Sequence, residues 1–214
     1  MTAWGRPISQ VTTKELRKFL MKYLKEEKKL PKILSDKKLD IFFRACDNYM
    51  YKTIFMMIYG SGLRISEATN LRVEDIDSEN MRLFVRNGKG ERQRYTVLPK
   101  ASLEMLSKCY KMYQPNHPEG YMFLNREGNP LKTERLRVFF RRYRRKAKIS
   151  EDFIVHSLRH AFATKLVEKG VPLVQVKELL GHSCIRSTMT YVHVANNMQK
   201  VDSPLDIYLE KKEK

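Results

Sequence analysis

Cysteine, acidic residues and long apolar runs are scarce in this chain, and each scarcity argues against a class of protein. The longest strongly apolar stretch, residues 54–59, is far too short to cross a bilayer. The N-terminus has no apolar region of the kind found in signal peptides. The three cysteines, Cys46, Cys109 and Cys184, are widely spaced and form no CxxC pair. This spacing favours a reduced cytoplasmic chain over a disulfide framework or a zinc site.

The charge balance of the chain is strongly basic. Lys and Arg number 42 against 24 Asp and Glu, which gives a formal net charge of +18 at pH 7. Such an excess indicates a polyanionic partner, either nucleic acid or an acidic membrane surface. The membrane is the weaker alternative, because no apolar face is paired with a basic one for insertion. With 214 residues and 10% aromatic side chains, the chain can bury one good-sized core or two small ones.

Apolar residues at helical spacing predict a series of short helices. A capping box at residues 12–15, followed by apolar residues at i, i+3 and i+4, predicts an amphipathic helix that ends before Pro31. Ser35 can cap a second helix, and a third, apolar helix covers about residues 52–61. Further helices are predicted over about residues 100–113, 133–148 and 172–180.

Two turns are predicted between these elements. Gly60 and Gly62 are expected to break the third helix and to form a tight turn just before Arg64. The sequence NGKG lies between two β-like runs, residues 82–86 and 92–97, which predicts a β-hairpin. The fold class expected from these elements is mainly α with a small antiparallel β-sheet (α+β).

The predicted helix over residues 133–148 has one apolar face and an adjacent face that is almost uniformly basic. The basic face comprises Arg137, Arg141, Arg144, Arg145 and Lys148. An isolated charge run is usually a solvated face. Here uniform sign costs self-repulsion, so contact with a polyanion such as DNA explains the pattern better.

Two arginines and two histidines suit the binding of a phosphodiester. Cleavage spreads negative charge over the non-bridging oxygens, and cations already in place stabilise that transition state. An arginine fork binds two phosphate oxygens at once and does not deprotonate, which suits Arg64 and Arg159. His156 and His160 lie on the same side of Arg159 if this segment is helical. Taken alone, Arg159 is as easily explained by a surface ion pair.

A histidine and a tyrosine near the C-terminus complete this set. His182 follows Gly181, the expected residue after the last turn of a helix, so this histidine is held at a helix end. Tyr191 comes nine residues later, after a polar segment. A phenol has a pKa of about 10, so attack at neutral pH needs a base or a strongly positive site. His156 can supply the base.

Four segments together resemble the tyrosine recombinase (phage integrase) family: GSGLRISEATNLRVEDID, NGKGERQR, HSLRHAFATKLVEKG and ELLGHSCIRSTMTYVHV. The resemblance runs over about residues 34–208, and the full set is highly specific although no single member is. It implies site-specific DNA recombination through a 3′-phosphotyrosyl intermediate and a free 5′-hydroxyl. The covalent bond conserves the free energy of the phosphodiester, so the resemblance implies no ATP, no other cofactor and no metal ion.

The resemblance also implies a role for individual residues. The catalytic set that it implies is Arg64, Lys89, His156, Arg159, His182 and Tyr191. Tyr191 is the nucleophile in this set, and Lys89, at the hairpin tip, enters the minor groove and acts as general acid. Glu67 matches an acidic residue that orients Arg64, and His160 matches a frequent supporting position beside the site.

The domain organisation is an expectation drawn from the same family. Its members usually begin with a core-binding domain of about 80–100 residues, a size typical of a small domain. Residues 1–31 are expected to be one amphipathic helix, a remnant of that domain, and residues 32–200 the catalytic domain. Residues 201–214 are expected to be a tail that docks on a neighbouring protomer of a cyclic homo-oligomer, a tetramer on paired DNA sites.

Two other functions are compatible with these residues. A type IB topoisomerase uses very similar chemistry, although the LLGH and HSLRHAFATKL segments favour a recombinase. A non-catalytic or weakly active DNA-binding fragment is the other alternative, because residues 1–31 are expected to hold only a remnant of the core-binding domain. The expected location for all three is the cytoplasm of a prokaryote, on double-stranded DNA.

Overall fold

The computed structural model describes residues 34–86, 93–192 and 195. The chain divides into two compact units, Met1–Leu30 and Pro31–Lys214, and every described residue belongs to the second. Three predictions therefore lie outside the described residues: the helix after residue 12, the hairpin turn that carries Lys89, and the tail over residues 201–214. Among the residues described, no helix is long and apolar enough to cross a membrane.

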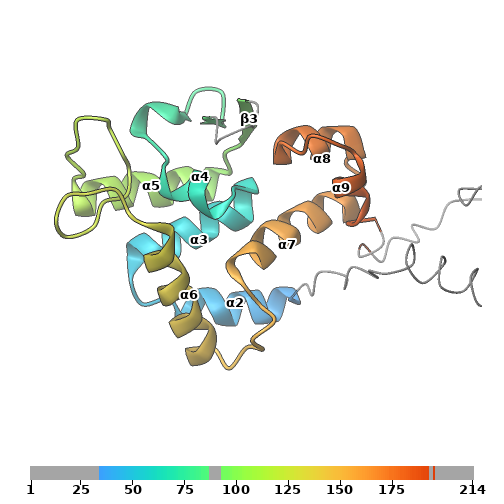
Figure 1. The fold of residues 1–214 in the computed structure, drawn as a ribbon, viewed down its shortest axis with the longest axis horizontal. Helices are drawn as coiled ribbons and strands as arrows, with labels where there is room; N and C mark the ends of the chain where they lie inside the picture. Colours follow the sequence, from blue (N-terminus) through green and yellow to red (C-terminus); the bar gives the residue numbers. More distant parts are fainter. Residues whose placement is uncertain (1–33, 87–92, 193–194, 196–214) are drawn as a thin grey trace, which may run out of the picture. The chain divides into compact units, whose positions relative to one another are not determined.

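The core is built around one apolar helix, α3 (Tyr49–Ser61), which packs against α5 (Lys100–Tyr113) and α7 (Val155–Glu168). α2 (Asp36–Ala45) packs against α6 (Thr133–Lys146). Figure 1 shows these helices surrounding α3. Because α3 is covered on several sides, its residues are apolar almost all round rather than along one stripe.

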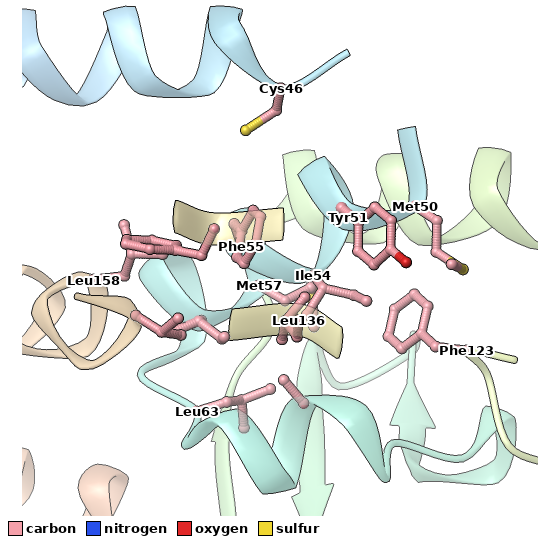
Figure 2. Packing of buried hydrophobic residues seen from close by; sticks show 14 of the residues in the cluster. Cys46, Met50, Tyr51, Ile54, Phe55, Met57, Leu63, Phe123, Leu136 and Leu158 are labelled. Atoms are coloured by element: carbon pink, nitrogen blue, oxygen red, sulfur yellow. The ribbon is translucent and has the colours of Figure 1, made fainter. Parts of the chain in front are cut away.

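Figure 2 shows how side chains from separate elements meet around α3. Ile54 and Phe55 of α3 are fully buried, and Leu136 of α6 and Leu158 of α7 are also fully buried in the same cluster. Burying one such side chain stabilises the fold by roughly 1.5–3 kcal/mol. This packing fixes α7, and with it the segment that carries the predicted H-x-x-R-H residues.

The β-structure is a three-stranded antiparallel sheet in the order β1-β2-β3. Its strands are β1 (Ile76–Asp77), β2 (Arg82–Val85) and β3 (Arg94–Val97). In β2, alternation buries Leu83 and Val85, and Leu83 pairs with Thr96 of β3. The two strands of the predicted hairpin are confirmed, whereas the two-residue β1 was not predicted. A mainly helical fold with a small antiparallel sheet is likewise confirmed.

The remaining helices are short: α4 (Ile65–Thr69), the 3₁₀ helix η2 (Val73–Asp75), α8 (Leu173–Leu180) and α9 (Arg186–Met189). The ends of α8 agree with the prediction to within one residue, and Gly181 ends it in the left-handed region at φ 66°. Figure 1 shows α8 and α9 following α7 at one end of this unit.

The start and end of α3 differ from the prediction. The helix begins at Tyr49 because the Asn48 side chain accepts a hydrogen bond from the Tyr51 amide, 3.1 Å away. It also continues through Gly60, which was expected to break it. Only Gly62 makes the turn, at φ 66°, and a Cβ there would lie 2.4 Å from the Phe162 ring. The chain therefore turns into α4 at one glycine rather than two.

Candidate active site

Three guanidinium groups converge on the carboxylate of Glu67. Arg94 binds it with both terminal nitrogens, each at 2.8 Å, and Arg64 Nη1 lies 2.9 Å from Oε1. Arg159 Nη1 lies 3.6 Å from Oε2. Burial raises the pKa of Glu67, but the hydrogen bonds and charges of Arg94, with smaller contributions from Arg64 and Arg159, lower it overall. The carboxylate is thus ionised and holds three cations around one negative charge.

The same three arginines also hold the C-terminal end of α8. The last carbonyls of a helix have no partner within the helix and carry partial negative charge. Three consecutive carbonyls each accept one guanidinium nitrogen: Leu179 from Arg94 Nε at 2.9 Å, Leu180 from Arg159 Nη2 at 2.6 Å, and Gly181 from Arg64 Nη2 at 3.4 Å. His182, the next residue, is therefore fixed beside the arginine cluster.

Arg159 is the most deeply buried member of the cluster. Its exposed fraction is 1%, and Nη1 donates to the carbonyl of Gly62 at 2.8 Å. Burial, aided by the charge of Arg64, lowers the pKa of Arg159 to about 10, so it stays charged at neutral pH. The fork that was expected to face a phosphate is thus bonded to two carbonyls. Nε is the buried nitrogen of this side chain that has no partner.

Tyr191 lies next to two histidines. Its side chain is 2% exposed, and its hydroxyl lies 3.0 Å from Nδ1 of His160. The rings of Tyr191 and His182 are stacked, with centroids 6.3 Å apart, and His182 Nδ1 lies 3.0 Å from Oγ1 of Thr188. His156 packs edge-on against His160, with ring centroids 4.4 Å apart. The three histidines and the tyrosine thus form a contiguous group.

Burial and positive charge set the protonation of this group. Burial, together with His156 and Arg159, lowers the pKa of His160 to about 4. Burial and the nearby arginines likewise lower the pKa of His182 to about 4. Both imidazoles are therefore neutral at pH 7, and His160 Nδ1 accepts a hydrogen bond from the Tyr191 hydroxyl when its proton is on Nε2. Burial raises the pKa of Tyr191, while Arg159 and Arg64 act in the opposite direction.

A comparison with protein-family models matches residues 9–198 to the model described as "Phage integrase family". The chain belongs to the phage integrase family.

Curated relatives support this membership. The integrase-family chain is 33% identical over 177 residues to tyrosine recombinase XerA of Pyrococcus horikoshii, covering 81% of this chain and 61% of that protein. It is 32% identical over 186 residues to XerC of Bacillus subtilis, covering 81% of this chain and 60% of XerC. The chain thus spans about three fifths of the length of these relatives.

Solved structures show the same fold. A crystal structure of XerA recombinase superposes with a TM-score of 0.71 at 21% identity, covering 92% of this chain and 72% of that one. XerH recombinase bound to its difH substrate, in a post-cleavage complex, gives a TM-score of 0.70 at 26% identity, covering 78% of this chain and 51% of XerH. The catalytic domain of bacteriophage HP1 integrase gives 0.60 at 22% identity, covering 78% of this chain and 90% of that domain.

The integrase-family chain brings most of its predicted site residues together. Glu67 and the five residues Arg64, Arg159, His160, His182 and Tyr191 form one connected cluster. His156 lies at its edge, exposed, and lines a pocket of about 430 Å³ that also includes Arg137 and Arg141. The placement of Lys89 lies outside the described residues.

The basic face predicted over residues 133–148 is divided in the structure, where α6 ends at Lys146 and Lys148 lies beyond it. Arg137, Arg141, Arg145 and Lys148 are exposed. Arg144 differs, because its side chain is 8% exposed and its Nη1 donates to the carbonyls of Glu151 and Phe153 at 2.6 and 3.3 Å. Arg144 therefore holds the loop before α7, and its assignment to an exposed DNA-binding face was wrong.

Arg94 was not singled out from the sequence. The signal was present in the strand alternation: in β3, Thr96 is buried, and Arg94, two residues earlier, lies on the same face of the strand. A charged residue on the inner face of a strand needs a buried partner, and Glu67 is that partner.

Among the residues described, no cluster of His, Cys, Asp and Glu is arranged to hold a metal ion.

Proposed function

We propose that this chain is a site-specific DNA recombinase that cleaves and rejoins strands through a covalent 3′-phosphotyrosine at Tyr191. The observation that carries the proposal is the hydroxyl of Tyr191, held by a neutral histidine in a cluster of arginines. A phenol that attacks a phosphodiester needs a nearby base and positive charge, and these surroundings supply both. The relative XerH, solved on its difH substrate, supports the choice of DNA as that phosphodiester.

In the proposed reaction the Tyr191 oxygen attacks the scissile phosphorus and the bond to the 5′-oxygen breaks. The phenolic proton passes to a histidine, either His160, which holds the hydroxyl here, or the exposed His156. The leaving 5′-oxygen takes a proton from Lys89. Attack by a 5′-hydroxyl on the phosphotyrosine reverses these steps, so one bond is exchanged for another and no energy source is consumed.

Arg64, Arg159 and His182 are proposed to bind the phosphate that reacts. Three guanidinium groups around Glu67 leave an excess of positive charge, which stabilises the charge that develops on the non-bridging oxygens. The unpartnered Nε of Arg159 supports this role, because a buried donor without a partner costs free energy until a ligand supplies an acceptor.

The proposal includes an assembly and a location. We infer that residues 32–200 act as the catalytic domain and that residues 1–31 retain one helix of a core-binding domain. Four chains would assemble on paired sites, each passing residues 201–214 to a neighbour, in the cytoplasm. The two alternatives, a topoisomerase-like enzyme and a non-catalytic fragment, gain no support from the comparisons, since the relatives reported above are recombinases and integrases.

The test is covalent capture on DNA. The full chain is incubated with duplexes of randomised sequence that carry a nick, and DNA that survives denaturation with the protein is recovered and sequenced. We expect wild type to yield an adduct and Tyr191→Phe to yield none, while both bind duplex DNA equally, because only the hydroxyl is removed. An adduct that persists in Tyr191→Phe removes Tyr191 as the nucleophile, and relaxation of supercoils without exchange between sites favours the topoisomerase.

A further inference from the structure

Arg94 is the member of the arginine cluster to which the reaction assigns no phosphate contact. Its side chain is 8% exposed, and its three nitrogens bind protein acceptors: both Nη atoms bind Glu67, and Nε binds the carbonyl of Leu179. Figure 1 shows β3, the strand that carries Arg94, beside α8, and the two elements are in contact. Arg94 therefore connects the sheet, α4 and the end of α8.

Gly181 shows how closely Arg94 packs on the turn that follows α8. A Cβ built at Gly181 would lie 2.9 Å from both Cδ and Nη1 of Arg94, and this glycine is in the left-handed region at φ 66°. His182 comes immediately after this turn, and its ring contacts Thr188 and Tyr191. A movement of Arg94 would thus be passed directly to His182 and, through it, to Tyr191.

Arg64 and Arg159 have a second task in the proposed reaction, which is to bind the scissile phosphate. Arg64 Nη2 donates to the Gly181 carbonyl at 3.4 Å, and a bound phosphate would compete for this nitrogen. Arg159 donates to the Leu180 carbonyl and would reach the phosphate through its unpartnered Nε. Arg94 then keeps the link between Glu67 and α8. It also occupies both oxygens of Glu67, which limits how strongly this buried carboxylate competes with phosphate for the other two arginines.

We propose that Arg94 is a positioning residue for strand cleavage, which holds the end of α8, and hence His182 and Tyr191, in place while Arg64 and Arg159 engage the scissile phosphate. The cleavage part of this inference rests on the proposed function. Its positioning part concerns the chain without DNA and can be measured independently.

The first measurement is hydrogen–deuterium exchange on the full chain without DNA. In Arg94→Met we expect amides of residues 176–191 to exchange at least about fivefold faster than in wild type, because local opening of α8 and α9 becomes easier. Amides of α3 should be unchanged. The matched control is Arg82→Met on the neighbouring strand, which removes an ion pair with Asp77 at 2.7 Å and leaves the hydrogen bonds to α8 in place. Equal exchange of residues 176–191 in Arg94→Met and wild type overturns the proposal.

The second measurement is single-turnover cleavage of a nicked duplex recovered in the capture experiment, at saturating protein. We expect Arg94→Met to cleave about 30- to 100-fold more slowly, with a Kd for the duplex within about threefold of wild type. Arg94→Lys should recover only a small part of the cleavage rate lost in Arg94→Met. Lysine keeps the charge but cannot bind both oxygens of Glu67 and the Leu179 carbonyl at the same time. Arg82→Met should cleave within about twofold of wild type.

A double variant separates positioning from general destabilisation. Without Arg94, the Glu67 carboxylate should compete more strongly with phosphate for Arg64 and Arg159. Arg94→Met combined with Glu67→Gln should therefore cleave about fivefold faster than Arg94→Met alone. Additive losses, or faster exchange in α3 as well as in α8, show that Arg94 merely stabilises the fold and overturn the proposal. Absence of any wild-type adduct on DNA sinks the proposed function instead, and the exchange experiment still decides the role of Arg94.

Discussion

At the scale of single residues, the two arginines that were expected to act alike are used differently. The Arg64 side chain is 25% exposed. Arg64 precedes the first residue of α4, and Glu67, three residues later, orients its guanidinium. Arg159 is 1% exposed and joins the end of α3 to the end of α8 through the carbonyls of Gly62 and Leu180. Arg64 is therefore placed to meet a ligand, whereas Arg159 also carries part of the fold.

Replacing each arginine by lysine should reveal this difference. Both Arg64→Lys and Arg159→Lys should slow cleavage by about 100-fold or more, because the planar fork is removed. Only Arg159→Lys should also destabilise the protein, on the order of 3 kcal/mol for two buried charged hydrogen bonds, or roughly 10 °C in Tm. Calorimetry and single-turnover cleavage measure the two effects. Equal Tm values for the two variants would contradict this division of roles.

The histidines beside Tyr191 should make stability depend on pH. The pKa of His160 is lowered on folding from its ordinary 6.5 to about 4, by burial and then by the charges of His156 and Arg159. Between these values the unfolded chain binds a proton that the folded chain does not, so acidification from pH 6.5 to pH 4 removes stability. The Tm of wild type should fall over this range, and that of His160→Asn should fall less steeply. Parallel curves would show that His160 is not the source.

At the scale of elements, α6 serves two purposes. Its apolar face, including Leu136, Phe140 and Tyr143, is buried in the core. Its exposed face carries Arg137, Arg141 and Arg145. Arg144 lies between these faces and reaches the loop before α7. α7 begins just beyond that loop, so Arg144 of α6 fixes the start of the helix that bears His156 and Arg159. The same helix, α6, presents its exposed arginines to solvent.

Variants on α6 should separate these purposes. Arg141→Gln combined with Arg145→Gln should weaken binding to any duplex and should make the salt dependence shallower by up to about 0.9 for each phosphate that is no longer neutralised. Arg144→Met should lower Tm with little change in that slope, because its guanidinium is bonded to the loop. Fluorescence titrations at several salt concentrations measure the slope. An unchanged slope in the double variant would mean that this face is merely solvated.

At the scale of the whole molecule, the described unit contains the candidate site except for Lys89, which lies outside the residues described. The site is assembled from α4, β3, α7 and the segment from α8 to Tyr191. Recombination on DNA would require several copies of this chain to act together, since it exchanges strands between two sites. The contacts between units are proposed to come from residues 201–214.

Removing the tail tests this coupling between chains. Deletion of residues 205–214 should leave folding and cleavage of a nicked duplex intact, while cooperative assembly on paired sites disappears. Its apolar residues, including Leu205, Ile207 and Tyr208, are too few to form a stable helix alone and need a surface to dock on. Analytical ultracentrifugation with paired-site DNA measures assembly. Assembly as cooperative as that of the full chain would show that the tail docks elsewhere.

Much of the fold was determined by local sequence. The spacing of apolar residues predicted α5 with its observed ends, and the pattern around NGKG predicted β2 and β3. Gly181 marked the end of α8 because a left-handed residue there favours glycine. These features depend on neighbours within a few residues, which is the range that a sequence pattern records. The residue types of the candidate site were also evident, since arginine suits the binding of phosphate and a tyrosine can act as nucleophile.

Tertiary structure alone decided which partner each charged side chain takes. Arg159 binds Gly62, 97 residues away, and Arg94 binds Leu179, 85 residues away. The alternation of β3 indicates that Arg94 faces inward, but no periodicity records which distant acceptors Arg94 and Arg144 bind. A buried guanidinium must find acceptors wherever packing brings them. The sequence therefore determined which groups are available for the chemistry, and the packing of α3, α7 and α8 determined how they are held.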